Sequence, residues 1–326
     1  MNRAFIFPGQ GSQIVGMGKD FYDNFDEAKS VFKIVDEVLN YPLSNIIFNG
    51  SIEELTLTEN TQPALMAVSI AILRVIIKQS GKKINELSSF VAGHSLGEYS
   101  ALCGVQSLSL EDTTKLLHIR GTSMQQASPQ GEGAMAACIG ITLKELKELL
   151  DFSSVDGICQ IANDNVEGQI VISGHDENIN YMLSVLKDLG YKAIKLKVSA
   201  PFHSALMKPA EAPMSSALIQ TNIKIPSVPL IANVTAKQTV SPDEIRSNLV
   251  SQICGTVRWR ETMDELHRLG VNELVEIGSG KVLTGLAKKT PHNFKVTNIS
   301  TVAEMEQFIT HLTQRHYFYA NLSVHS

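Results

Sequence analysis

The sequence has few cysteines and no long uninterrupted hydrophobic run. Its four cysteines show no C-x-x-C spacing and lie in apolar surroundings, so we interpret them as core thiols. The longest apolar stretch, residues 64–77, is interrupted by Ser69 and Arg74. It is too short to span a bilayer and predicts a buried helix. We expect a protein without a signal peptide, located in the reducing cytoplasm and not in a membrane.

An excess of positive charge is also missing. The chain carries 28 Lys and Arg against 33 Asp and Glu, a net charge of -5, whereas nucleic-acid binders need basic surfaces to neutralise phosphates. With 44% hydrophobic and 19% charged residues, the composition is that of an ordinary globular protein. The length of 326 residues is enough for about two domains.

The N-terminus has the start of a nucleotide-binding pattern but not its end. An apolar run at residues 4–7 leads into the glycine-rich sequence FPGQGSQ at residues 7–13. A Rossmann fingerprint needs a third glycine where this chain has Ile14. A P-loop fails too, because no glycine lies five positions before Gly18 and no Ser or Thr follows Lys19. The loop is therefore not predicted to bind a nucleotide phosphate.

The order of apolar and helical patterns indicates an α/β protein with an insertion. Residues 1–123 alternate short apolar runs with helical patterns, which predicts a largely parallel sheet, and the alternation resumes after residue 200. The segment between them has the order β-α-β-β-α-β of the ferredoxin-like split motif. We predict an α/β-hydrolase-like large domain (1–123 and 200–314), an inserted ferredoxin-like small domain (124–199) and a C-terminal tail (315–326) with no clear period from residue 316.

Individual elements follow from apolar runs and capping residues. The capping boxes TLKE at residues 142–145 and SPDE at residues 241–244 predict two helix starts. Asn, Asp and Gly between residues 163 and 168 predict a turn. Strands are predicted at residues 4–7, 89–92, 134–139, 158–162, 169–173, 192–198, 230–233, 273–277 and 295–299, and helices at residues 96–103 and 176–189.

The strongest chemical signal is GHSLG at residues 93–97. It lies between a predicted strand and a predicted helix, which is the context of a G-x-S-x-G nucleophile elbow. The glycines fit this turn because the serine backbone is strained and a neighbouring Cβ would clash. We predict that Ser95 is a nucleophile; a purely structural turn is the alternative.

A serine nucleophile needs a base, and His203 is the candidate. It lies where the chain re-enters the large domain, from which a side chain can reach a cleft between the domains. From the residues alone, another histidine such as His94 stays open as the base. The acids between Ser95 and His203 lie mostly at helix starts or in the small domain, so no third triad member stands out. We expect a Ser–His dyad oriented by a backbone carbonyl.

Six motifs occur in a fixed order along the chain. Together they resemble the malonyl-CoA:acyl carrier protein transacylase family and the related acyltransferase domains of polyketide synthases, over about residues 3–312. The motifs are FPGQGSQ (7–13), GHSLGEY (93–99), RG (120–121), PFHS (201–204), VRW (257–259) and EIGSGKVL (276–283).

The resemblance implies a role for each part of the reacting centre. Ser95 would be the acylated nucleophile, His203 its base, and the backbone carbonyl of Gln252 the group that orients the histidine. The amides of Gln10 and Leu96 would form the oxyanion hole. On this view the glycines at the N-terminus let the backbone approach a reacting carbonyl and not a pyrophosphate.

The resemblance also changes the interpretation of Arg120. Taken alone it would be a solvated helix charge, but the family pattern implies that it binds the malonyl carboxylate, which suits a permanently charged, two-pronged guanidinium. Met124, one turn later, would line the acyl pocket or belong to the core. Phe202 also resembles malonyl-selecting members.

The implied activity is transfer of a malonyl group from malonyl-CoA to the phosphopantetheine thiol of acyl carrier protein, through a malonyl-serine intermediate, for fatty-acid biosynthesis. No metal or redox cofactor is implied. Carrier proteins are acidic, so a basic patch is expected near the cleft, with Lys192, Lys195 and Lys197 as candidates or as a solvated strand face. A serine hydrolase and a non-catalytic docking module are the alternatives.

Overall fold

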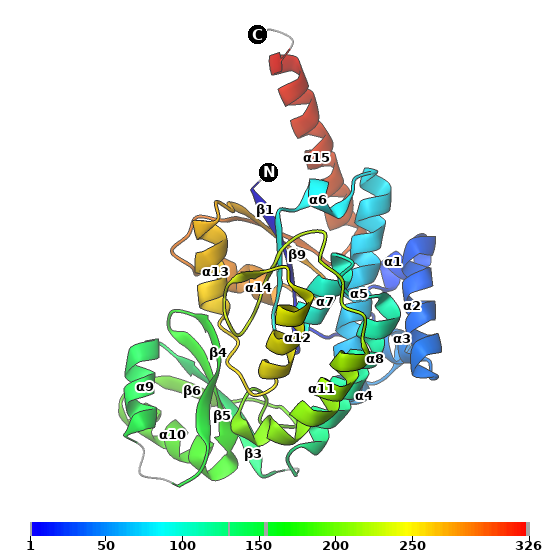
Figure 1. Cartoon of the computed structure of the whole chain (residues 1–326). Coiled ribbons are helices and arrows are strands. Elements are labelled where there is room, and N and C mark those ends of the chain that lie inside the picture. The colour runs from blue at the N-terminus through cyan, green and yellow to red at the C-terminus, as the bar shows by residue number, and fades with distance from the viewer. Residues whose placement is uncertain (1, 130, 153–155, 324–326) are drawn as a thin grey trace.

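The computed structural model describes residues 2–129, 131–152 and 156–323, which form two lobes around two separate sheets (Figure 1). The larger sheet has the order β10-β9-β1-β2-β7-β8, and its neighbours are parallel except β7 with β8. This mostly parallel sheet confirms the expected α/β fold class. Its strands are β1 (Arg3–Phe7), β2 (Phe90–Gly93), β7 (Leu230–Ile231), β8 (Gln238–Thr239), β9 (Glu273–Ile277) and β10 (Lys295–Ile299).

Strand β1 shows why an apolar run is needed here. Side chains alternate along a strand, and both faces of this sheet are covered. Phe5 and Phe7 belong to the larger hydrophobic core, whereas Ala4 and Ile6 belong to a second core cluster. All of them are buried, which a half-exposed strand would not allow.

Helix α5 (Thr58–Ser80) is the one helix in the described part of the chain that is long and apolar enough to cross a membrane. However, 89% of its most apolar window is buried inside the protein, where it packs against α2, α7 and α8. The predicted buried helix at residues 64–77 is therefore confirmed. The other helices of the large lobe are α1 (Lys19–Asn24), α2 (Asp26–Leu39), α3 (Leu43–Asn49), α4 (Ile52–Thr56), α6 (Ile84–Leu87), α7 (Gly97–Gly104), α8 (Leu110–Gln126), η1 (Ala205–Ala210), α11 (Glu211–Gln220), α12 (Pro242–Ser251), α13 (Trp259–Arg268), α14 (Val282–Ala287) and α15 (Val302–Ser323).

The small lobe has the predicted β-α-β-β-α-β order. Its four strands are antiparallel in the order β4-β5-β3-β6, and its two helices pack on them through their own hydrophobic cluster. That separate core supports our proposal of a small domain over residues 124–199, except that residues 124–126 belong to α8 of the large lobe. The elements are β3 (Gly133–Ile139), α9 (Leu143–Asp151), β4 (Cys159–Val166), β5 (Gln169–His175), α10 (Asp176–Asp188) and β6 (Lys192–Lys195).

The capping predictions are confirmed in one case and half confirmed in the other. Thr142 and Glu145 form a reciprocal capping box at the start of α9. At the start of α12, Ser241 accepts a hydrogen bond from the Glu244 amide. The Glu244 carboxylate instead accepts from the Thr239 hydroxyl at 2.7 Å, so the second half of that box is replaced by a contact with β8.

Three predicted boundaries were wrong. Residues 163–165, predicted as a turn, lie in β4, where register shifts let the strand keep pairing with β5. The strand predicted at residues 192–198 ends at Lys195, because the chain then leaves the sheet and lines a cavity. The strand predicted to reach residue 233 ends at Ile231, and Asn233 turns toward the loop after β2 instead.

The predicted loose tail was also wrong as far as Ser323. Helix α15 runs through residues 316–323 and projects from the body of the protein (Figure 1), while residues 324–326 lie outside the described part. Its first half is anchored by buried Met305, Phe308 and Leu312. Once such a start is fixed, each further residue adds one helical hydrogen bond, so weak periodicity does not end the helix.

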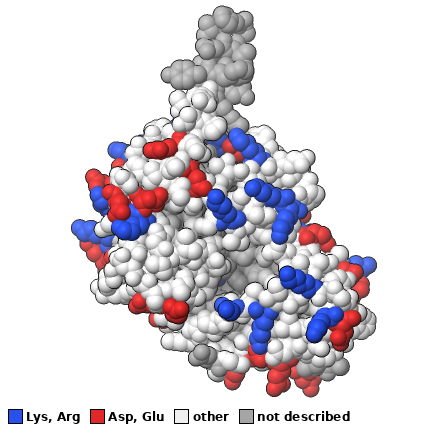
Figure 2. All heavy atoms as spheres, turned by 180° about the vertical axis from the view of Figure 1, so that it is seen from behind, with Lys and Arg blue, Asp and Glu red and all other residues white. Residues whose placement is uncertain are grey.

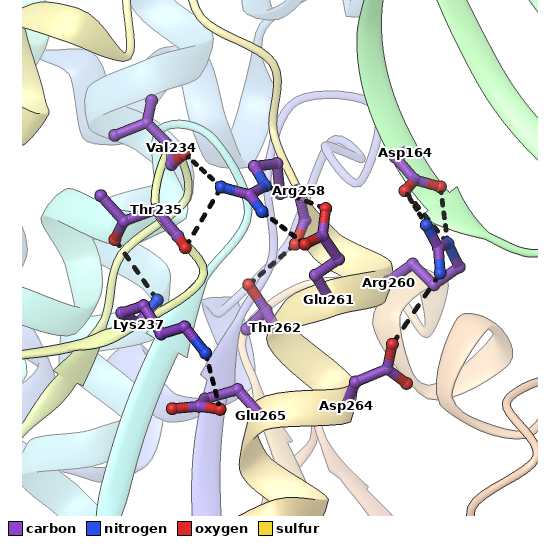
Figure 3. A network of polar contacts seen from close by, with 10 residues as sticks. All are labelled: Asp164, Val234, Thr235, Lys237, Arg258, Arg260, Glu261, Thr262, Asp264 and Glu265. Atoms are coloured by element: carbon purple, nitrogen blue, oxygen red, sulfur yellow. Dashed lines mark hydrogen bonds and ion pairs between the residues drawn. The ribbon is translucent and has the colours of Figure 1, made fainter. Parts of the chain in front are cut away.

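The two lobes are joined along β4. The backbone of Asp164 donates to Val257 at 3.0 Å and that of Val257 donates to Ala162 at 2.8 Å. Arg260 of α13 donates to both carboxylate oxygens of Asp164, at 2.8 to 3.1 Å (Figure 3). The end of β4 is therefore fixed against the large lobe beside the loop that carries Ser95.

Candidate active site

Ser95 lies in a sharp turn between β2 and α7. Its φ is 53°, a left-handed conformation that a non-glycine residue rarely adopts. A Cβ at Gly93 would lie 1.8 Å from the carbonyl oxygen of Gly97, and a Cβ at Gly97 would lie 2.3 Å from that of Phe7. Both glycines of the GHSLG motif are therefore required by close backbone contacts, as the sequence indicated.

The structure brings His203 to Ser95. The Ser95 Oγ and His203 Nε2 atoms are 2.7 Å apart, and His203 Nδ1 lies 2.9 Å from the backbone oxygen of Gln252. Because that oxygen only accepts, Nδ1 carries the proton and Nε2 faces the hydroxyl as an acceptor. Burial, and then the charge of Arg120, lowers the pKa of His203 to about 3, so the imidazole is neutral.

His94 points elsewhere. Its Nε2 lies 2.8 Å from Asn165 Oδ1 at the end of β4, and its ring packs 5.5 Å from that of Trp259. Burial lowers the pKa of His94. His94, next to Ser95 in the sequence, therefore holds the turn against the small lobe, while the distant His203 contacts the Ser95 hydroxyl.

Arg120 is buried beside Ser95, with 1% of its surface exposed. It donates to Gln62 Oε1 at 2.8 Å, to Gln252 Oε1 at 2.9 Å and to Ser95 Oγ at 3.1 Å. Its guanidinium also lies 5.6 Å from the centre of the Tyr99 ring. All of these groups are uncharged, so the buried cation has no direct carboxylate partner among them.

These side chains open into a cavity of about 280 Å³ between the two lobes. Gln10 lines it on one side, and Leu196, Lys197 and Val198 of the small lobe line it on another. Met124 also lines the cavity and is fully buried, which agrees with a place in the core and leaves its role in an acyl pocket a prediction. Leu96 follows Ser95 directly and is the N-cap residue of α7.

Three polar residues of this site were missed by the sequence reasoning: Gln62, Glu98 and Asn233. The Asn233 side chain accepts from the Ser95 amide at 2.8 Å and donates to the Gly93 carbonyl at 2.7 Å, which holds the turn from both ends. Glu98 was detectable as a charge within an otherwise apolar start of α7. Gln62 and Asn233 carried no comparable local signal.

Within the described residues, no group of three or more His, Cys, Asp or Glu side chains is placed to hold a metal ion. The four cysteines are free. Burial raises the pKa of the Cys103 thiol to about 11, in agreement with a core thiol.

The large lobe has a mostly parallel sheet and a serine turn that faces a histidine, and a small antiparallel lobe is inserted into it. These features place the protein among α/β enzymes with a serine at a strand-to-helix turn. The chain belongs to the acyl transferase domain family, whose model matches residues 4–324.

Three similar proteins of that family are named for malonyl transfer. The chain is 44% identical to the malonyl CoA-acyl carrier protein transacylase of Bacillus subtilis over 95% of this chain and 97% of that protein. It matches the crystal structure of an acyl-carrier-protein S-malonyltransferase from Bartonella henselae with a TM-score of 0.93 and 50% identity, over 96% and 100% of the chains. It also matches a malonyl-transacylase solved in complex with a type II polyketide acyl-carrier protein, with a TM-score of 0.91 and 37% identity, over 95% and 100% of the chains. The chain is accordingly a malonyl CoA-acyl carrier protein transacylase by family.

Proposed function

We propose that this enzyme transfers the malonyl group of malonyl-CoA to acyl carrier protein through a malonyl-Ser95 intermediate, and so supplies fatty-acid synthesis. One observation carries the assignment of residues. The Ser95 hydroxyl lies within hydrogen-bond distance of both a neutral histidine and a buried arginine. A nucleophile, a base and a cation for a carboxylate thus meet at one oxygen atom.

In the first half of the reaction, Ser95 Oγ attacks the thioester carbon of malonyl-CoA and His203 Nε2 takes the hydroxyl proton. The negative charge that develops on the thioester oxygen is stabilised by the backbone amides of Gln10 and Leu96. The carbon–sulfur bond then breaks, and the protonated His203 returns the proton to the leaving CoA thiolate. Gln252 keeps the imidazole oriented throughout, through its backbone carbonyl.

In the second half, the phosphopantetheine thiol of acyl carrier protein takes the place of CoA. His203 removes the thiol proton, and the sulfur attacks the malonyl-Ser95 ester. Collapse of the intermediate forms the new thioester, and His203 protonates Ser95 Oγ. The neutral state of His203 supports both halves, because a base has to be unprotonated before each attack.

Arg120 binds the distal carboxylate of the malonyl group. A guanidinium forms a two-pronged, charge-assisted pair with a carboxylate. Gln62 and Gln252 fix the Arg120 side chain, and they leave its positive charge unneutralised by direct contact. The buried Phe202 ring and Met124 bound the space for the acyl group.

The carrier protein approaches the hollow between the lobes, whose rims carry Lys and Arg side chains (Figure 2). Of the three lysines expected from the sequence, Lys197 lines the cavity, Lys195 pairs with Asp176, and Lys192 is exposed on β6. Lys197 is therefore the best placed of them to meet an acidic partner. Four free thiols support a reducing, cytoplasmic location.

Mass spectrometry after mixing with malonyl-CoA tests the proposal. A malonyl adduct should form on Ser95 and disappear when acyl carrier protein with a free phosphopantetheine thiol is added. Rapid loss of the adduct to free malonate without the carrier would indicate a hydrolase. The absence of any adduct would contradict the acyl-enzyme mechanism.

A further inference from the structure

Glu98 is a buried carboxylate that the proposed chemistry does not use. It lies in the first turn of α7, three residues after Ser95, and only 1% of it is exposed. Its Oε2 atom accepts from Gln252 Nε2 at 2.6 Å and from the Asn233 backbone amide at 3.3 Å. A carboxylate buried in this way costs free energy unless its charge is compensated.

The Gln252 side chain connects Glu98 to Arg120. Its Oε1 atom accepts from Arg120 at 2.9 Å, whereas its Nε2 atom faces three oxygens, those of Glu98, the Ser95 carbonyl at 3.1 Å and the Asn233 side chain at 3.3 Å. A guanidinium only donates, and a carboxylate or a carbonyl only accepts. The amide therefore has one orientation that satisfies both ends, and Glu98 supplies the strongest acceptor that fixes it.

We propose that Glu98 is a positioning residue for malonyl selection: its carboxylate locks the Gln252 carboxamide so that Gln252 Oε1 holds the Arg120 guanidinium at Ser95. Glu98 also places a negative charge behind a cation whose direct partners are neutral. This inference rests on the proposed role of Arg120 and adds to it the acid that keeps the guanidinium in place.

The groups around Glu98 allow its titration to be recognised. Burial raises the pKa of Glu98 to about 7, partly offset by its hydrogen bonds and by Arg120 of α8. On its own helix, burial raises the pKa of Tyr99 far above neutrality, and α12 and the loop at Asn233 contribute only amides. His203 stays neutral near pH 7.

The sign of the pH effect follows from the charge. As pH falls through about 7, Glu98 takes up a proton, its hold on the Gln252 amide weakens, and Arg120 is less well placed. We therefore expect malonyl transfer to decline on the acid side of neutrality. Acetyl transfer, which does not use Arg120, should not show this decline.

The test is Glu98→Gln in the full-length enzyme, assayed with malonyl-CoA and acetyl-CoA across pH. This change keeps the shape and removes the charge. Losing a charge-assisted hydrogen bond should lower kcat/KM for malonyl-CoA by roughly 10- to 100-fold. The kcat/KM for acetyl-CoA should stay within about threefold of the unmodified enzyme. The decline of malonyl transfer on the acid side of neutrality should disappear. Glu98→Asp, which restores a carboxylate, should restore the decline of malonyl transfer on the acid side. It is also the variant to assay if Glu98→Gln fails to fold.

Glu276→Gln is a matched control. Glu276 is also fully buried with its pKa raised by burial, but it accepts from the amides of Leu283 and Thr284 at the start of α14. The Glu276→Gln variant should have a lower melting temperature and an unchanged ratio of kcat/KM for malonyl-CoA to kcat/KM for acetyl-CoA. The positioning role is overturned if Glu98→Gln lowers kcat/KM for malonyl-CoA and acetyl-CoA in parallel, or if malonyl transfer still declines on the acid side of neutrality. Failure of the proposed function would look different, since the unmodified enzyme would then form no malonyl-Ser95.

Discussion

Two arginine clusters in this molecule use the same side chain in opposite ways. At the candidate active site, Arg120 donates to two glutamines and a serine, and the Glu98 carboxyl is linked to it through Gln252. On α13, Arg260 pairs directly with Asp164 (Figure 3). The first arginine keeps its charge available to a ligand, whereas the second has already been neutralised by the fold.

The burial of the two clusters sharpens this contrast. Arg120 is 1% exposed, whereas the Arg260 side chain is 26% exposed and still forms carboxylate pairs. A buried guanidinium held only by neutral groups loses more solvation than it regains. In the proposed function, the malonyl carboxylate is the anionic partner that this guanidinium lacks, so binding energy goes to substrates that carry a carboxylate. An arginine that already holds a carboxylate has little to offer a second anion.

The largest expected effect tests whether the buried cluster is the reactive one. Ser95→Ala should abolish covalent malonylation, because the hydroxyl that meets His203 and Arg120 is removed. Intact-protein mass spectrometry with malonyl-CoA measures this directly. An acyl adduct that persists on the variant would show that the nucleophile lies elsewhere.

The second effect concerns the base. His203→Ala should slow acylation by roughly 10²–10⁴-fold, the usual range for general-base catalysis. Pre-steady-state release of CoA gives the acylation rate, and circular dichroism confirms that the fold is intact. A rate close to that of the unmodified enzyme would reassign the role, with His94 as the next histidine to test.

The third effect tests the contrast between the arginines itself. Arg120→Ala leaves the malonyl carboxylate unpaired, a loss of about 2–5 kcal/mol, or roughly 30- to 4000-fold in kcat/KM for malonyl-CoA. Acetyl-CoA has no carboxylate, so its kcat/KM should hold or rise. Steady-state assays with both thioesters measure the ratio. A parallel loss with both substrates, accompanied by a lower melting temperature, would mean that Arg120 only braces α8.

The smallest effect on activity is expected for the other arginine. Arg260→Ala should leave the malonyl-to-acetyl ratio unchanged and kcat/KM within about twofold. It should lower the free energy of unfolding by about 1–3 kcal/mol, because the buried Asp164 carboxylate loses its donors. Chemical denaturation measures this, with Lys33→Ala in an exposed pair as a control expected to change little. A changed substrate ratio would show that the α13 cluster also shapes the site.

The sequence could predict what depends on local pattern. GHSLG between a strand and a helix singled out Ser95 because the turn, its glycines and the proposed nucleophile are consecutive residues. The alternation of elements gave both sheets and the inserted lobe. Arg120 and Arg260, by contrast, look alike in the sequence, since each lies among mixed polar and apolar residues of a helix. Only the family resemblance distinguished Arg120.

The parts that were missed depend on contacts between distant segments. Glu98 and Gln252 are separated by 154 positions, and Arg120 and Gln62 by 58, so no spacing rule links them. The end of β4 was predicted as a turn from its Asn and Asp residues. Tertiary contacts with residues 256–260 of the large lobe keep it extended instead.

Both partners of the Ser95–His203 hydrogen bond have a left-handed backbone, with φ of 53° and 58°. An isolated segment would relax from this conformation, at a gain of roughly 1–2 kcal/mol for each residue. The reactive geometry is thus maintained by the intact fold against the preference of its own two segments. On heating, these segments should relax before the sheets separate. Catalysis should then fade at temperatures where the molecule is still folded, and activity would report early damage that a melting curve does not detect.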